Sequence, residues 1–223
     1  MEKFFYENSQ EENLLKKFRN KEYREIKDLK NDSRSKVTLI DIDGEQYVYK
    51  IPLEKNKRIW QRILSIFRGG ESKREFENYK KVLKAGFNGP TPLIYGERKR
   101  YGMVVDSFLI STYVQGKKST VEDLDKILET LKKIHAQGFL HGDSQLANFT
   151  LSEGKVYLID TKMNKNIYGA IGEAYEYIYL EESCYQELTQ VDKSTLSYRV
   201  AKSLNSYLHW YGGVRKKIKN FFK

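Results

Sequence analysis

The clearest pattern along the chain is the β-like run of apolar and polar side chains over residues 36–51. Two β-rich runs flank the dipeptide Asp43-Gly44, which is the strongest short-range signal for a β-hairpin. Pro52 ends the second run, because proline has no backbone N–H to donate to a strand ladder. The pattern therefore predicts a hairpin that carries Lys50 at the end of its second strand.

Residues 72–85 change to a helical period, with apolar side chains three and four positions apart, and Gly86 ends the helix. Short apolar runs at residues 93–95, 103–105 and 108–114 predict further strands. These segments indicate a small, mostly β first lobe with one main helix.

The pattern becomes mostly helical after residue 116. Ser119 or Thr120 can cap a helix with a continuous apolar stripe, which ends at Gly138. A short hairpin is predicted over residues 149–159, and residues 171–211 carry two more helical patterns.

These elements predict an α+β fold in two lobes, and 223 residues suffice for a substantial core. The expected divisions are a helical N-terminal extension at 1–35, a β-rich first lobe at 36–116 and a reduced, mostly helical second lobe at 117–223.

The charge balance points to a polyanionic partner. Lys and Arg number 40 and Asp and Glu number 30, which gives a net charge of +10. Nucleic acid, an anionic membrane face or a phosphorylated glycolipid would each suit this charge. No recognisable nucleic-acid-binding motif is present, so nucleic acid is not expected.

Two basic amphipathic stretches, residues 55–68 and 214–223, resemble segments that lie in anionic membrane interfaces. The alternative is that both pack on the protein and keep their lysines in solvent. We expect a cytoplasmic chain, because it has no signal peptide or long apolar run. The two stretches would make it peripheral at the inner membrane. A single cysteine, Cys184, excludes an intrachain disulfide and fits a reducing compartment.

The candidate chemistry centres on the sequence His-Gly-Asp-Ser-Gln-Leu-Ala-Asn-Phe at residues 141–149. It places the carboxylate of Asp143 five residues before the amide of Asn148. Twelve residues later an apolar run ends at a second carboxylate, Asp160. This spacing is typical of a phosphoryl-transfer site, in which the first Asp is the base and the other two bind Mg²⁺.

Such a site also needs a cation for the phosphates of the nucleotide. Lys50 lies on a predicted strand, and Glu75 on the following helix could hold it, with Glu77 as the weaker choice. The backbone of Thr112, Tyr113 and Val114 would border the adenine of ATP.

The segments at residues 134–149 and 157–162 resemble the lipopolysaccharide core heptose(II) kinase family, whose members share the Gly-Asp-x-x-x-x-Asn-Phe loop and the Ile-Asp strand end. The resemblance runs from about residue 36 to 170. It implies a protein-kinase-like fold, ATP as phosphoryl donor, Mg²⁺ as cofactor and a lipopolysaccharide sugar as acceptor.

Carried over residue by residue, the resemblance implies that Asp143 is the catalytic base. Asn148 and Asp160 would bind the metal, and Lys50 and Glu75 would act at the phosphates. Asp43-Gly44 stands where protein kinases have several glycines over the phosphates, so this one turn would have to cover them.

Two alternatives stay open. RIO-type and Bud32-type atypical Ser protein kinases share the His-Gly-Asp and Ile-Asp motifs, and a pseudokinase scaffold would bind a membrane or a partner without catalysis. The short chain, the missing Gly-rich loop and the basic tail favour the glycolipid kinase.

The remaining histidines and tyrosines have structural interpretations. We expect His135 and His141 to hold the catalytic loop by hydrogen bonds, and His209 to lie in the core. Tyrosines cluster after Asp160, and packing is expected of most of them, with stacking on a sugar as the alternative. They are Tyr168, Tyr175, Tyr177, Tyr179 and Tyr185.

Overall fold

The computed structural model describes the backbone of residues 2–221 and the side chains of residues 2–215. The chain forms two compact units. The first comprises residues 1–117 and 152–160, and the second comprises residues 118–151 and 161–223. An N-terminal β-sheet and a mostly helical C-terminal part confirm the predicted α+β class.

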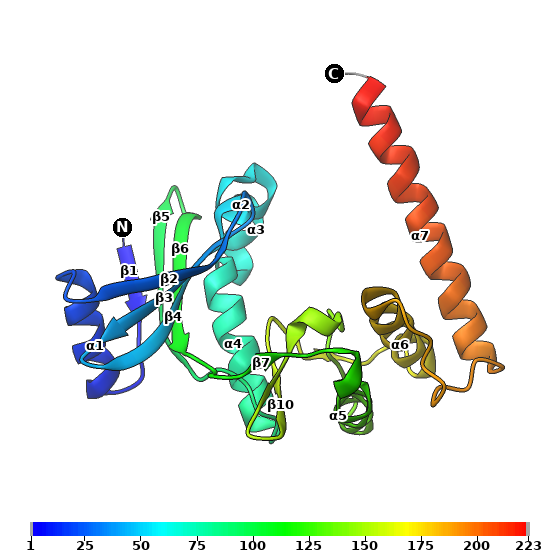
Figure 1. Cartoon of the computed structure of the whole chain (residues 1–223). Helices are drawn as coiled ribbons and strands as arrows, with labels where there is room; N and C mark the ends of the chain where they lie inside the picture. Colours follow the sequence, from blue (N-terminus) through cyan, green and yellow to red (C-terminus); the bar gives the residue numbers. More distant parts are fainter. Residues whose placement is uncertain (1, 222–223) are drawn as a thin grey trace. The chain divides into compact units, whose positions relative to one another are not determined.

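The first unit is built on a six-stranded antiparallel sheet of order β1-β5-β6-β4-β3-β2 (Figure 1). Its strands are β1 (Glu2–Phe5), β2 (Arg24–Asn31), β3 (Lys36–Ile42), β4 (Glu45–Ile51), β5 (Pro92–Arg100) and β6 (Met103–Thr112).

The hairpin of β3 and β4 has the predicted turn. Ile42 pairs with Glu45, and the two residues between them, Asp43 and Gly44, have φ values of 57° and 85°. Positive φ at both central residues is what a two-residue turn of type I′ requires, and it explains the choice of Asp-Gly.

Two helices cover opposite faces of this sheet. On β6, Ile110 joins a cluster with Leu14 of α1 (Ser9–Arg19). Its neighbour Leu109 packs instead with Phe76 of α4 (Glu71–Lys84). Successive strand residues point to opposite faces, so α1 and α4 lie on different sides. Between β4 and α4 the chain forms α2 (Leu53–Lys57) and α3 (Ile59–Arg68).

The N-terminal segment differs from the helical extension that the sequence suggested. Only α1 is helical there, and β1 and β2 are outer strands of the sheet. All eight residues of β2 are exposed, so this strand carries no alternation of buried and solvated side chains. Charged, exposed outer strands of this kind discourage edge-to-edge aggregation but leave little signal in the sequence.

The second unit contains three long helices: α5 (Leu124–Ala136), α6 (Ala170–Cys184) and α7 (Leu196–Phe221). Its short strands β8 (Phe139–Leu140) and β11 (Asn164–Lys165) pair with each other. The other short elements of the chain are β7 (Lys117–Lys118), β9 (Phe149–Ser152), β10 (Lys155–Leu158) and 3₁₀ turns at Val121–Asp123 and Leu146–Asn148.

The apolar stripe expected on α5 forms the core here, with Ile127, Leu131 and Ile134 fully buried. The expectation that His209 lies in the core is wrong. His209 is exposed on α7 and contacts Glu182, and its neighbour Trp210 is 63% exposed. In residues 2–221 the structure shows no helix long and apolar enough to cross a bilayer.

Candidate active site

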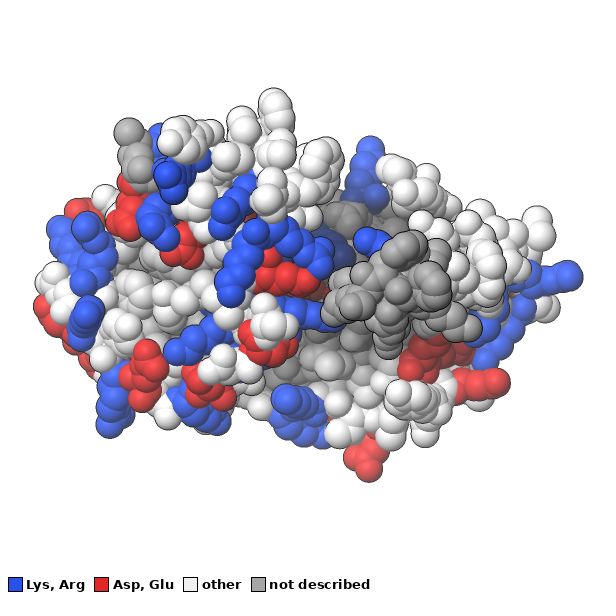
Figure 2. All heavy atoms as spheres, turned by 90° about the horizontal axis from the view of Figure 1, so that it is seen from above, with Lys and Arg blue, Asp and Glu red and all other residues white. Residues whose placement is uncertain are grey.

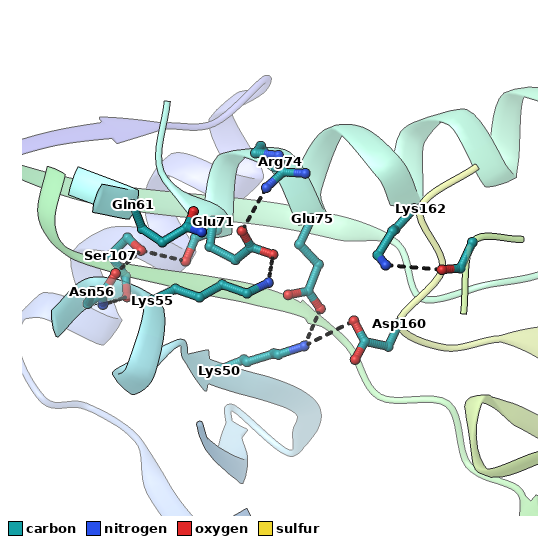
Figure 3. A network of polar contacts seen from close by, with 12 residues as sticks. Lys50, Lys55, Asn56, Gln61, Glu71, Arg74, Glu75, Ser107, Asp160 and Lys162 are labelled. Carbon is teal, nitrogen blue, oxygen red and sulfur yellow. Dashed lines mark hydrogen bonds and ion pairs between the residues drawn. The ribbon is translucent and has the colours of Figure 1, made fainter. Parts of the chain in front are cut away.

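Three of the predicted site residues meet within the first unit. The ammonium of Lys50 lies 2.7 Å from Glu75 Oε1 and 3.8 Å from Asp160 Oδ1 (Figure 3). Lys50 comes from β4, Glu75 from α4, and Asp160 follows β10 after one residue. Glu77 is exposed, so of the two carboxylates considered, Glu75 is the partner of Lys50.

This cluster is partly buried, and burial shapes its charges. Burial alone would lower the pKa of Lys50, but the carboxylates of Glu75 and Asp160 outweigh it and raise that pKa above its usual range. Burial raises the pKa of Glu75, and the nearby Lys50 opposes this shift. The hydroxyl of Tyr79 donates a further hydrogen bond of 3.2 Å to Glu75. Lys50 is therefore a fixed cation at neutral pH.

Asp160 has a left-handed backbone, with φ of 56°. Among residues with a side chain, Asp and Asn tolerate this conformation best. The side chain of Asp160 is 60% exposed, so one of its oxygens can face a ligand while the other lies near Lys50. Left-handed backbone outside glycine concentrates at functional sites.

The prediction that Asp43-Gly44 covers the phosphates is wrong. Lys50 pairs with Val37 at the start of β3, whereas Asp43-Gly44 lies at the opposite end of the same two strands. Lys50 is six positions along the strand from Gly44, which is roughly 20 Å. The turn next to Lys50 is instead residues 32–35, between β2 and β3.

The backbone amides of this turn bind a carboxylate that belongs to the turn itself. The carboxylate of Asp32 accepts the backbone N–H groups of Arg34 and Ser35, each at 2.8 Å. These amides are therefore engaged within the turn, and Arg34 adds an exposed cation to it. The turn contains no glycine.

The segment expected to border adenine lies at the end of β6. The N–H of Thr112 donates to Thr91 O at 2.9 Å, and the N–H of Tyr113 donates to Gln46 O at 3.3 Å. Both amides are thus used within the first unit. Of the three residues named for this role, Val114 is the one whose amide can serve as donor to a base.

Two further predicted residues lie together in the second unit. The amide nitrogen of Asn148 donates to Asp143 O at 2.9 Å, which closes the loop between them. The N–H of Asp143 donates to His141 Nδ1 at 3.3 Å. The side-chain nitrogen of Asn148 is engaged in this hydrogen bond, so its side-chain oxygen is the atom that can bind a cation.

Glu176 of α6 holds the start of the loop at residues 141–148, and the sequence did not indicate it. Its carboxylate accepts the N–H groups of His141 at 3.0 Å and Gly142 at 2.5 Å, and it lies 2.9 Å from His135 Nε2. Burial alone would raise the pKa of Glu176, but the hydrogen bonds from His135 and the two amides outweigh it and lower that pKa. His135 and His141 do form the hydrogen bonds that were expected of them.

No signal in the sequence singled out Glu176. It lies between Tyr175 and Tyr177 on a helix that is buried along more than one side, with no clear amphipathic stripe. A buried carboxylate on such a helix resembles an ordinary solvated one in the sequence.

We expect Glu176→Gln to destabilise the protein by about 3 kcal/mol at pH 7, because one charged acceptor then leaves buried N–H groups poorly paired. The folded-state pKa of Glu176 lies below its ordinary value of 4.5. Its stabilisation is therefore present above pH 4.5 and is lost as the pH falls through the folded pKa. Thermal unfolding at pH 7 and pH 4 measures this.

The matched control for this prediction is Glu173→Gln on the same helix, at a more exposed carboxylate. It should change the melting temperature little at either pH. Equal melting temperatures for Glu176→Gln and the unchanged chain at pH 7 would contradict the role given to Glu176.

Among the described residues, no group of three or more His, Cys, Asp or Glu side chains is arranged to hold a metal ion by itself. Asp160 in the first unit and Asn148 in the second each offer a hard oxygen donor of the kind that Mg²⁺ prefers. Magnesium in phosphoryl-transfer sites is bound by one or two carboxylates plus phosphates and water, so the chemistry of each donor fits this ion.

Positive and negative side chains alternate on the one face of the molecule that Figure 2 draws. On the face drawn in Figure 2, Lys and Arg are interspersed with Asp and Glu. The net charge of +10 is therefore not gathered into one uniform basic patch on that face.

Comparison with known proteins identifies a family and relatives of this chain. The family model described as lipopolysaccharide core biosynthesis protein (WaaY) matches residues 2–184. A lipopolysaccharide core heptose(II) kinase WaaY of Escherichia coli strain K12 is 29% identical over 160 residues, which cover 69% of each chain. A second Escherichia coli heptose(II) kinase WaaY is 29% identical over 147 residues, covering 62% of this chain and 63% of the relative.

One solved structure, described as WaaP in complex with acyl carrier protein, has a TM-score of 0.55 with 11% sequence identity. The match covers 99% of this chain and 100% of that one. At this identity the match supports the fold.

Proposed function

Because the chain belongs to the lipopolysaccharide core biosynthesis protein (WaaY) family, we propose that it transfers the γ-phosphoryl group of ATP to a sugar hydroxyl of the lipopolysaccharide core, with a heptose as acceptor. The observation that carries this proposal is the Lys50–Glu75 ion pair with Asp160 beside it. A fixed cation paired with a helix carboxylate and a nearby metal-binding Asp is the arrangement that kinases use at the phosphates.

In the proposed reaction the acceptor oxygen attacks the γ-phosphorus while the bond from that phosphorus to the β–γ bridging oxygen breaks. ADP leaves with the bridging oxygen, and Asp143 takes the proton of the attacking hydroxyl. Asp143 is suited to this role because Asn148 and His141 fix the backbone of its loop. Mg²⁺, held by Asp160 and Asn148, would neutralise charge on the phosphates.

The contacts to the phosphates of ATP would also differ from those in protein kinases, where several glycines lie over them. Since the amides of the turn at residues 32–35 are engaged by Asp32, the guanidinium of Arg34 is the group we assign to phosphate contact there. Val114 N–H would donate to the adenine edge. Lys50 would contact the α- and β-phosphates.

The test is phosphate transfer from labelled ATP with Mg²⁺, offering purified core glycolipid and bulk protein side by side. We expect label on the glycolipid. Label on protein alone would replace this proposal with an atypical Ser protein kinase. No transfer, together with no binding of Mg²⁺–ATP, would replace it with a scaffold.

We further propose that α3 attaches the enzyme to an anionic membrane surface. One face of this helix presents Ile59, Trp60 and Phe67, which are 72%, 66% and 87% exposed. Basic side chains lie on or next to it. They are Lys55, Lys57, Arg58, Arg62 and Arg68. Apolar side chains beside basic ones suit the interface of an anionic bilayer.

The tail at residues 214–223, named for the same role, lies mostly outside the residues whose side chains are described. Its part in membrane contact rests on its sequence. We accordingly assign the enzyme to the cytoplasmic face of the inner membrane, where its ATP and its lipid-linked acceptor would meet.

Exchanging Trp60 and Phe67 for Ser should reduce co-sedimentation with vesicles that contain anionic lipid by about tenfold, because two exposed anchors are lost. Tyr101→Asn is the control, since Tyr101 is 82% exposed on the β5–β6 turn and outside α3. Unchanged co-sedimentation of the double variant would contradict the membrane role of α3.

A further inference from the structure

The second unit contains a hollow of about 490 Å³ beside Asp143. It is lined by the loop that carries Asp143, by Lys162, by α6 as far as Tyr179 and by Leu204 and Leu208 of α7. Ligand-binding pockets have volumes of roughly 300–1,000 Å³, so the hollow can hold a sugar unit and part of its neighbour. None of the nucleotide roles proposed above uses it.

Lys162 supplies a fixed cation at this hollow. Its ammonium donates to Gly142 O at 3.0 Å (Figure 3), and its backbone N–H donates to His141 O at 2.8 Å. Its side chain lies against Gly142, where an added Cβ would come within 2.9 Å of Lys162 Cβ. An ammonium has three donors, so Lys162 can bind an anion in the hollow while it keeps Gly142.

Two aromatic rings form a wall of the same hollow. Tyr175 and Tyr179 are one helical turn apart on α6, and their rings lie 6.3 Å apart and 15° from parallel. Gln145 donates to the hydroxyl of Tyr179 at 2.9 Å, which ties this ring to the catalytic loop. Ile171 and Leu208 add apolar surface. Flat aromatic surface beside a few fixed polar groups orients a ligand with one apolar face.

We propose that this hollow is the acceptor subsite. It takes a sugar ring against Tyr175 and Tyr179, with the reacting hydroxyl at Asp143, and Lys162 binds an anionic group, phosphate or carboxylate, that the acceptor carries. The proposal rests on the kinase function proposed above and adds how the acceptor is recognised.

The cation has the position that such recognition needs. Lys162 is bonded to the residue that precedes Asp143, so an anion held by Lys162 fixes the distance between the acceptor and the base. Holding a reactant in this way lowers the entropic cost of reaching the reactive geometry. The nearby carboxylate of Glu176 already accepts from two backbone amides and contacts His135, and Lys162 is not among these partners. The ammonium of Lys162 can therefore serve an anionic ligand in the hollow.

The first test measures steady-state transfer from ATP to core glycolipid by Lys162→Met, with Lys165→Met as control. Lys165 is exposed on β11 and does not line the hollow. We expect the acceptor KM of Lys162→Met to rise about 10- to 100-fold, as for loss of one charge-assisted hydrogen bond, with the KM for ATP within twofold. Lys165→Met should match the unchanged chain.

Acceptor treated with phosphatase separates the two sources of the anion. If the anion is a phosphate, treatment should weaken binding to the unchanged chain and not to Lys162→Met. If the anion is a carboxylate, treatment should leave the effect of Lys162→Met in place. An unchanged acceptor KM, or a rise in the KM for ATP alone, would overturn the role of Lys162 in this subsite.

The aromatic wall is tested with Tyr175→Leu, which keeps an apolar side chain at this position and removes the aromatic ring. Tyr207→Leu is the control, because Tyr207 is 56% exposed on α7 and lies outside the hollow. We expect a rise of about tenfold in the acceptor KM for Tyr175→Leu alone, as stacking contributes moderately. No change would overturn the stacking role of this ring.

Failure of this proposal is distinguishable from failure of the kinase function. If the unchanged chain phosphorylates the glycolipid and the hollow variants do so equally well, the function stands and the subsite is elsewhere. If the unchanged chain transfers no phosphate to glycolipid, calorimetric titration with the lipid-free core oligosaccharide tests the hollow separately. Binding weakened in Lys162→Met would keep the subsite, and no binding would overturn it.

Discussion

Asp143→Asn should lower kcat for phosphate transfer about 10³-fold, because the amide cannot accept the proton of the attacking hydroxyl. The KM for ATP should change less than threefold, since Asp143 is not assigned to the nucleotide. The fold should be kept, as the backbone contacts of Asp143 with Asn148 and His141 do not involve its carboxylate. Initial rates with labelled ATP and thermal melting measure both expectations.

Asp125→Asn is the matched control for this variant, because Asp125 is exposed on α5 in the same unit. It should transfer phosphate at the unchanged rate. If Asp143→Asn kept more than a third of the activity of the unchanged chain, Asp143 would not be the base, and the reaction would need another proton acceptor.

Lys50→Met should destabilise the protein by about 3 kcal/mol at pH 8 and abolish measurable phosphate transfer. It leaves the carboxylate of Glu75 buried without its cation, and breaking a buried ion pair from one side is strongly destabilising. The estimate is taken at the low end because the side chain of Lys50 is 20% exposed. Loss of the cation also removes the contact proposed for the phosphates.

The deficit of Lys50→Met should depend on pH. Burial raises the pKa of Glu75, and without Lys50 nothing in the pair opposes this shift. A group with a raised folded-state pKa stabilises the fold below its unfolded pKa and loses this contribution as the pH rises through the folded value. The difference in melting temperature between the variant and the unchanged chain should therefore be smaller at pH 5 than at pH 8.

Lys36→Met is the control for the loss of a lysine from an ion pair on the same sheet. Lys36 lies 4.0 Å from Glu25, and both side chains are more exposed than those of Lys50 and Glu75. Its melting temperature should change little at either pH, since exposed pairs contribute less than about 1 kcal/mol. A deficit of Lys50→Met that is equal at pH 5 and pH 8 would contradict the protonation of Glu75.

Local patterns predicted the parts of the fold that local chemistry controls. Asp43-Gly44 specified a hairpin turn because both residues must adopt positive φ there. The helical period predicted the helix that carries Glu75, and its pairing with Lys50 followed from the order of the elements. The spacing of Asp143 and Asn148 likewise predicted that they lie in one loop, since five residues suffice for the loop that their hydrogen bond closes.

Features that depend on tertiary neighbours could not be predicted from local patterns in the sequence. The role given to Asp43-Gly44 failed because the strand β2, fully exposed and charged, was read as part of a helical extension. Once β2 is placed beside β3, the turn at residues 32–35 lies next to Lys50 instead. Glu176 was missed for a related reason, as its ligands come from residues more than thirty positions away.

The pair of Glu176 and His135 constrains how the sequence can change over generations. Each residue fills a buried position that the other satisfies, and Glu176 also accepts from two backbone amides, which every substitution except one to proline keeps. Replacing His135 first leaves a partly satisfied acid, and replacing Glu176 first leaves three donors without their acceptor. A sequence that loses this pair must therefore go through a less stable intermediate with one residue replaced, or first gain another contact that stabilises the loop. We expect the two positions to be conserved or replaced together, whereas an exposed α6 residue such as Ala170 should vary more freely.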